Sequence, residues 1–141
     1  MVNRDKIRDK VQIIKNNIRR LEKIKQNSLN EFLENPLMPD ASIRILQVSI
    51  EAMLDISHHI VSRKHLGTPK TYRETIELLE QNGIITKKQL PTFVNMVKFR
   101  NRAVHLYDEI ANEEIYEIIQ SHLTDFEDFI GAIVHCCMNN H

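Results

Sequence analysis

The chain has few of the residues that interrupt helices. Its 141 residues include three glycines, four prolines and no tryptophan. No segment alternates apolar and polar residues with the period of two that is typical of a strand. Because 42% of the residues are hydrophobic, this scarcity of turn formers favours long helices. We therefore predict an all-α fold, with one domain over residues 1–141 that is long enough to bury a core.

The chain also has no net charge and only two cysteines. Lys and Arg together number 19, as do Asp and Glu, so net charge gives no reason to expect binding to nucleic acid or membrane. A polyanion must therefore bind to a local positive region. The two cysteines, Cys136 and Cys137, are adjacent, which suits a structural disulfide poorly. The first residues lack the apolar core of a signal peptide and no stretch approaches a membrane span, so we expect a cytoplasmic protein.

Apolar periodicity predicts four long helices and one short helix in an up-and-down bundle. The predicted helices run over residues 5–34, 41–66, 72–81, 91–106 and 112–136. Asp40 is predicted to cap the second helix at its N-terminus, and Gly67 to follow its last turn. Thr68 and Pro69 are predicted to open the third helix.

One segment, Lys98 to Tyr107, places a guanidinium in an apolar helical face. At about 100° per residue, Arg100 shares a stripe with apolar neighbours on both sides. These neighbours are Phe93, Val97, Val104 and Tyr107. A charge there is unusual, because Arg is rarely buried unless it is paired. Asn101 and His105 lie one turn apart on the flank of the stripe. A cation, an amide, an imidazole and a phenol on one patch suit a phosphate ester better than a core.

A structural interpretation of the same residues is also open. Arg100 would bond to a carboxylate, and His105 would interact favourably with the helix dipole at the C-terminus. Tyr107 would be a half-buried core aromatic. The polar stripe of the second helix would be solvated, as such stripes usually are. The alternative for that stripe is that Glu51 or Asp55 faces Arg100 or lines the same groove.

The segment also resembles a known motif. Arg100, four further residues, His105, one residue and Tyr107 match the R-x4-H-x-Y motif of the HEPN superfamily, and Asn101 is the polar residue that usually follows its arginine. The wider Phe-Arg-Asn-x-x-Val-His-x-Tyr pattern is similar to the HepT branch, whose small helical proteins are encoded beside a minimal nucleotidyltransferase. The similarity extends to residues 43–55 and 67–72, and to the spacing of the helices.

The resemblance implies a ribonuclease toxin that cleaves RNA without metal. His105 suits the acid or base task, because a pKa of ~6.5 keeps both protonation states available near neutrality. Arg100 suits the negative charge that gathers on the phosphoryl oxygens, and Asn101 would support either residue. In HepT-type pairs the cognate nucleotidyltransferase antitoxin adenylylates the tyrosine of the motif, which implies Tyr107 here. A nucleotide at Tyr107 would fill the groove and repel RNA.

The mechanism needs a base and an acid, and one motif histidine per chain supplies only one of them. A two-fold homodimer would bring two copies of His105 and two of Arg100 into a single groove, and the resemblance implies this arrangement. Such a groove would be basic even though the whole protein is neutral. By helical position, Arg44, Lys98 and Arg102 are predicted to extend it as RNA-binding cations.

Two other functions remain open at this point. One is a non-catalytic nucleotide- or protein-binding subunit that partners a nucleotidyltransferase, and the other is a purely structural helical adaptor. We expect no metal, because His135, Cys136, Cys137 and His141 lack the spacing of common metal sites. We expect no cofactor, because the Gly-rich loops that bind phosphates are missing.

Overall fold

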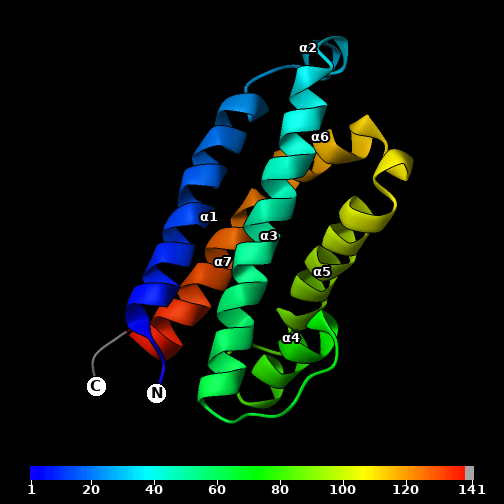
Figure 1. The fold of residues 1–141 in the computed structure, drawn as a ribbon. Helices are drawn as coiled ribbons and strands as arrows, with labels where there is room; N and C mark the ends of the chain where they lie inside the picture. Colours follow the sequence, from blue (N-terminus) through cyan, green and yellow to red (C-terminus); the bar gives the residue numbers. More distant parts are fainter. Residues whose placement is uncertain (139–141) are drawn as a thin grey trace.

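A computed structural model describes residues 1–138 as a bundle of helices (Figure 1). The α-helices are α1 (Arg4–Lys25), α2 (Leu29–Glu34), α3 (Leu37–Arg63), α4 (Tyr72–Gln81), α5 (Leu90–His105), α6 (Asn112–Ser121) and α7 (Leu123–Ile133). A short 3-10 helix, η1 (Tyr107–Glu109), follows α5, and a π-helical segment, η2 (Val134–Met138), follows α7. These residues contain no strand, so the prediction of an all-α bundle is confirmed.

The first predicted helix is two helices in the structure. The chain turns after Lys25 and resumes at α2, where Ser28 and Glu31 form a capping box. The Ser28 hydroxyl accepts the Glu31 N–H at 3.1 Å, and the Glu31 carboxylate accepts the Ser28 N–H at 2.8 Å. The prediction of one helix was wrong because a Ser-x-x-Glu pattern satisfies the backbone donors of a new helix start.

The central helix α3 begins earlier than predicted. It starts at Leu37, so Pro39 lies inside its first turn, where a missing N–H removes no helical hydrogen bond. Asp40 is therefore a first-turn residue rather than the N-cap. The Asn35 side chain instead accepts the Leu37 N–H at 3.2 Å.

The C-terminus of α3 also differs from the prediction. The residue with left-handed backbone is His65 (φ 53°), and the Leu66 N–H returns to the Val61 carbonyl at 2.9 Å. This hydrogen bond is the Schellman pattern that ends a helix, so Gly67 is not the residue that closes α3. Gly67 has φ 154°, and a Cβ there would meet the Leu78 side chain at 3.0 Å. A close approach therefore explains the glycine.

Two further helix starts and breaks are corrected. Thr71, rather than Thr68, caps α4, because its hydroxyl accepts the Glu74 N–H at 3.1 Å. The last predicted helix breaks at His122, which leaves helical geometry (φ −124°, ψ 7°) and separates α6 from α7. The apolar spacing of the last predicted helix puts His122 on its core face, but this side chain is exposed and lies 3.1 Å from Asp125, so that prediction was wrong.

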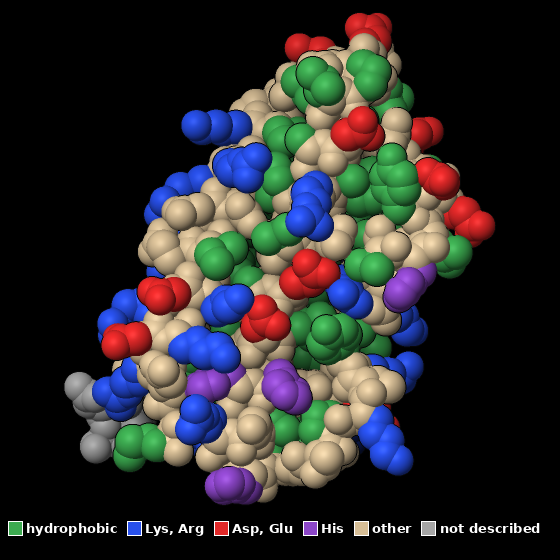
Figure 2. All heavy atoms as spheres, viewed as in Figure 1, with side chains coloured by type: hydrophobic (Ala, Val, Ile, Leu, Met, Phe, Trp, Pro, Cys, Tyr) green, Lys and Arg blue, Asp and Glu red, His purple; other side chains and the backbone are tan. Residues whose placement is uncertain are grey.

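Charged side chains cover the outer side of α1, while its inner side packs on α3. Figure 2 shows Lys and Arg side chains along this outer side. On the inner side, the buried Asn17 amide donates to the Ser49 hydroxyl at 3.0 Å and ties α1 to α3. No helix within residues 1–138 is both long and apolar enough to cross a membrane.

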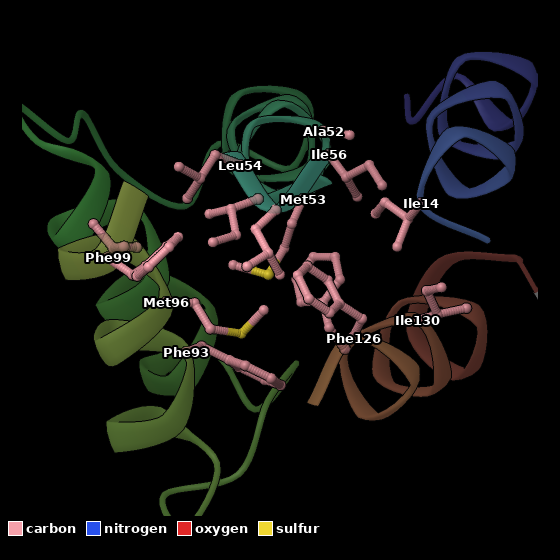
Figure 3. Packing of buried hydrophobic residues seen from close by; sticks show 14 of the residues in the cluster. Ile14, Ala52, Met53, Leu54, Ile56, Phe93, Met96, Phe99, Phe126 and Ile130 are labelled. Atoms are coloured by element: carbon pink, nitrogen blue, oxygen red, sulfur yellow. The ribbon is translucent and has the colours of Figure 1, made fainter. Parts of the chain in front are cut away.

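The core lies around α3, which packs against α1, α4, α5 and α6. The spacing of the second predicted helix puts one apolar half toward the core, and all of its residues are buried: Ile43, Leu46, Ile50, Met53, Leu54, Ser57, Ile60 and Val61. Figure 3 shows Met53 of α3 between Met96 of α5 and Phe126 of α7. Phe93 meets Phe129 edge to face at 5.6 Å between ring centroids. This packing holds α5 beside α3 and so fixes where the motif of α5 lies.

Candidate functional site

The motif occupies the C-terminal part of α5 and the turn that follows. The helix ends at His105, Leu106 leaves helical geometry, and Tyr107 begins η1. The predicted apolar stripe is buried at Phe93 and Val97, but Val104 and Tyr107 are exposed. The stripe therefore leaves the core near Arg100, and the residues after it face outward.

Arg100 lies at this boundary, with 16% of its side chain exposed. Its Nε and Nη2 both donate to one oxygen of Glu51 on α3, at 3.2 and 3.1 Å. Its Nη1 donates to the Asn101 side-chain oxygen at 3.2 Å. The guanidinium also lies over the Tyr72 ring, 5.0 Å from its centroid. We call Glu51, Asn101 and Tyr72 the Arg100 cradle.

The cradle orients the guanidinium without using it fully. An Arg has five N–H donors. The bonds to Glu51 and Asn101 use three of them in the part of the chain that the structure describes. Stacking on Tyr72 holds the plane of the group through a cation–π contact. Two N–H groups thus remain for an anionic ligand.

His105 and Tyr107 are both exposed beyond the cradle. His105 lies five residues after Arg100 on the same helix, about 7.5 Å further along its axis. Tyr107 is 53% exposed and does not belong to the hydrophobic core, so it is not the core aromatic of the structural interpretation. Val104 and Leu106 are exposed beside them. An imidazole and a phenol therefore share an outward surface with apolar side chains.

The structure separates the two candidate carboxylates of α3. Glu51 bonds to Arg100, as one of the two alternatives predicted, and also accepts from the Gln47 amide at 3.3 Å. Asp55, one turn further on, bonds instead to Lys10 of α1 at 2.9 Å. Glu51 therefore belongs to the cradle and Asp55 to the neighbouring surface.

The predicted RNA-binding cations do not gather around Arg100 within one chain. Arg102 forms two hydrogen bonds to Glu114 of α6, at 2.7 and 2.8 Å. Lys98 lines a hollow of about 480 Å³ together with Arg102 on the side of α5 that faces α6 and α7. Arg44 is exposed on α3. Their roles in RNA binding stay predictions.

Tyr72 is a site residue that the sequence did not reveal. It lies 28 positions before Arg100 in the chain and starts α4, which packs against both α3 and α5. No local pattern marks such a contact, because it depends on how α4 is placed relative to α5.

No metal site is apparent among residues 1–138, where no group of three or more His, Cys, Asp or Glu residues lies close enough to hold an ion. His141 lies outside these residues. Burial raises the pKa of the Cys137 thiol to about 12, so this thiol is protonated near neutral pH.

An all-α bundle with this motif at the end of one helix has the features of the HEPN superfamily. The chain belongs to the ribonuclease HepT-like family, whose model matches residues 14–133. It is 36% identical over 129 residues to the "mRNA nuclease HepT" of Shewanella oneidensis, covering 92% of this chain and 96% of that protein. It is 26% identical over 127 residues to the "tRNA nuclease HepT" of Aphanizomenon flos-aquae, covering 90% and 86%.

Solved structures show the same fold. One is the tri-AMPylated HEPN toxin of Shewanella oneidensis in complex with its MNT antitoxin, with TM-score 0.86 and 34% identity over 94% of this chain and 99% of that chain. Another is a toxin–antitoxin complex with AMP-PNP, with TM-score 0.86 and 34% identity over 93% and 98%. The fold is thus one that relatives use in complexes between a toxin and an antitoxin.

Proposed function

We propose that this protein is a ribonuclease toxin that cleaves RNA without a metal ion and is controlled by a nucleotidyltransferase antitoxin. The observation that carries the proposal is the Arg100 cradle, which leaves N–H donors unused five residues before the exposed His105 on the same helix. The names of the HepT relatives support RNA as the substrate.

The reaction needs a base, an acid and a cation. A base removes the proton of a ribose 2′-OH, and the 2′ oxygen then attacks the adjacent phosphorus. A bond forms between phosphorus and O2′, the bond to O5′ breaks, and the acid protonates the leaving oxygen. Imidazole performs either proton transfer near neutral pH, so His105 takes this role. Arg100 stabilises the charge on the phosphoryl oxygens, and Asn101 holds Nη1 of Arg100.

Two copies of the chain supply both proton transfers. The exposed Val104 and Leu106 flank His105 and offer apolar surface for a two-fold contact. Such a contact brings the two His105 rings into one groove, where one acts as base and the other as acid. Sedimentation should show a dimer, and Leu106→Asp should dissociate it; a wild-type monomer that cleaves RNA would refute the shared site.

Loss of the imidazole tests the ribonuclease. Wild-type protein in EDTA should cleave labelled single-stranded RNA, and His105→Ala should slow the cleavage by at least ~10²-fold, the usual contribution of a general acid or base. His122→Ala is the matched control, because that ring is also exposed but lies between α6 and α7. Cleavage that needs a divalent cation, or that persists in His105→Ala, contradicts the proposal. Failure to cleave, with retained binding to the nucleotidyltransferase, favours the alternative of a non-catalytic subunit.

Control by the antitoxin acts through Tyr107. The phenol oxygen attacks the α-phosphorus of ATP held by the nucleotidyltransferase, pyrophosphate leaves, and the phenol proton passes to a base. The added phosphate places negative charge two residues from His105 and repels RNA. The exposure of Tyr107 and the AMPylated state of the Shewanella toxin support this assignment.

A phenylalanine at position 107 tests this control. With antitoxin and ATP, the wild type should gain the mass of AMP and lose cleavage, whereas Tyr107→Phe should keep its activity and its mass. The control is Tyr72→Phe, which keeps the ring under Arg100 and should still be modified. Silencing of Tyr107→Phe as complete as that of the wild type would refute covalent control.

A further inference from the structure

A basic groove adjoins the Arg100 cradle on the side of α1. It is a hollow of about 590 Å³ between the first turns of α1, the last turns of α3 and the start of α4. The side chains in its lining that matter here are Lys6, Lys10, Asp55, His58, Arg63 and Tyr72. Figure 2 shows Lys, Arg and His side chains gathered at this end of the molecule, over α1 and α3.

The groove carries more positive than negative charge. Its lining holds three cations, Lys6, Lys10 and Arg63, and one carboxylate, Asp55, which bonds to Lys10 at 2.9 Å. The one carboxylate of the lining is thus paired with Lys10 and not with Lys6 or Arg63. The neighbouring His59 responds to this field: burial, then the charges of Lys6 and Arg63, lower its pKa.

His59 is a buried residue of the groove lining and does not add charge to it. Its Nε2 accepts the Asn3 N–H at 2.9 Å, which requires an unprotonated nitrogen at that position. His58, the preceding residue, also lines the groove and is exposed. The groove therefore combines fixed cations with an accessible imidazole.

The groove is continuous with the site at one end and with a second hollow at the other. Tyr72 lines the groove and also stacks on the Arg100 guanidinium. His58 and Ser62 line both the groove and a further hollow of about 370 Å³, which reaches His65 in the loop after α3. From Glu51 to Arg63 the surface follows α3 for about 18 Å.

We propose that this groove binds the backbone phosphates of the RNA on one side of the cleaved bond, with Lys6 and Arg63 as the main contacts. The inference rests on the proposed function and extends it to how the substrate is held. Because the whole chain has no net charge, its attraction for a polyanion must come from such a local region. The Tyr72 ring is partly exposed and offers a surface on which a base stacks.

Binding measurements in a His105→Ala background test the groove without cleavage. Fluorescence anisotropy gives the affinity for short and long single-stranded RNA at several salt concentrations. Adding Lys6→Ala and Arg63→Ala should weaken binding of the long RNA by roughly tenfold, and should reduce the slope of log affinity against log salt by about 0.7 for each phosphate that is no longer neutralised. The short RNA should be affected less, because it does not reach the groove.

Lys87→Ala with Lys88→Ala is the matched control. Both lysines are exposed and lie outside the groove. Their substitution removes the same charge, so this double variant should bind RNA like the His105→Ala parent. An unchanged affinity and salt slope after removal of Lys6 and Arg63 overturns the inference. So does loss of antitoxin binding alone, which would make the groove a protein contact. A wild type that fails to cleave is a different result: it refutes the ribonuclease, while the binding experiment still decides the groove.

Discussion

Two arginines, two residues apart on α5, bond to carboxylates in different ways. Arg102 meets Glu114 with two parallel hydrogen bonds of 2.7 and 2.8 Å, one to each oxygen. Arg100 directs two N–H groups at a single oxygen of Glu51, at 3.1 and 3.2 Å. The longer bonds belong to the less exposed arginine, since the Arg102 side chain is 41% exposed and that of Arg100 only 16%.

The difference indicates that Arg102 joins two helices, whereas Arg100 is held in a fixed orientation at the candidate site. The bidentate pair engages both oxygens of Glu114 and joins α5 to α6. The hydrogen bond to Arg102 lowers the pKa of Glu114, and the same bond raises the pKa of Arg102. At Arg100 the carboxylate, the Asn101 amide and the Tyr72 ring fix the orientation of a guanidinium whose side chain is only 16% exposed. A partly dry, oriented cation of this kind is suited to charge that appears during a reaction.

Exchanging each arginine should give the largest contrast. Arg100→Ala should lower kcat for RNA cleavage by about 10²–10³, the cost of removing one preorganised donor to a developing charge. Arg102→Ala should lower kcat far less, because Arg102 lies about 200° from Arg100 around α5 and pairs with Glu114 of α6. Arg100→Lys should recover only part of the rate, since an ammonium lacks the planar fork. Equal losses at the two positions would show that the difference in bonding has no functional meaning.

Changes at Glu51 should sharpen the comparison with a smaller effect. Glu51→Ala removes the acceptor that orients Arg100 and should lower kcat by about tenfold, since small misplacements of a catalytic group are costly. Glu51→Gln keeps a side-chain oxygen at that place and should restore most of the rate. This rescue identifies Glu51 as a positioning residue, because a residue needed for its charge would not be replaced by an amide. Thermal melting of both variants checks that the fold is intact.

Periodicity predicted the bundle well but not the ends of its helices. The buried half of α3 follows from the spacing of its apolar residues, because one helix face meets the core. The break at Ser28 depends on a capping box, whereas at His122 the backbone leaves helical geometry without a side-chain cap, and neither break interrupts the apolar spacing. The residue with left-handed backbone at the end of α3 is His65. Because this conformation favours glycine, the sequence indicated Gly67 instead.

Only those residues of the candidate site that lie close together in the sequence could be predicted. Arg100, His105 and Tyr107 lie within the ten-residue segment from Lys98 to Tyr107, and the cation on its apolar stripe drew attention to them. The partners of Arg100 come from α3 and α4, and the sequence narrowed the carboxylate to two candidates without deciding between them. Arg102 shows the converse: its helical position suggested an RNA contact, while its partner Glu114 lies on a helix whose packing no local pattern gives.

The smallest expected effect is on stability, at the Arg102–Glu114 pair. Its bonds hold the pKa of Glu114 below its ordinary value of 4.5 in the folded protein, so the pair stabilises the fold above that value. This stabilisation is lost as the pH falls through the folded pKa. Because both side chains are more than a third exposed, Glu114→Gln should lower the free energy of unfolding by no more than about 1 kcal/mol at pH 7.

Urea unfolding at pH 7 and at about pH 3 measures this contribution, and the difference between wild type and Glu114→Gln should shrink at the acidic pH. Glu113→Gln is the control, because Glu113 also lies in the first turn of α6 and shares the favourable helix dipole. A difference specific to Glu114 at neutral pH therefore isolates its bond to Arg102. If Glu113→Gln has the same effect, the bidentate geometry contributes no more than the dipole, and the contrast between the two arginines then depends on the Arg100 cradle alone.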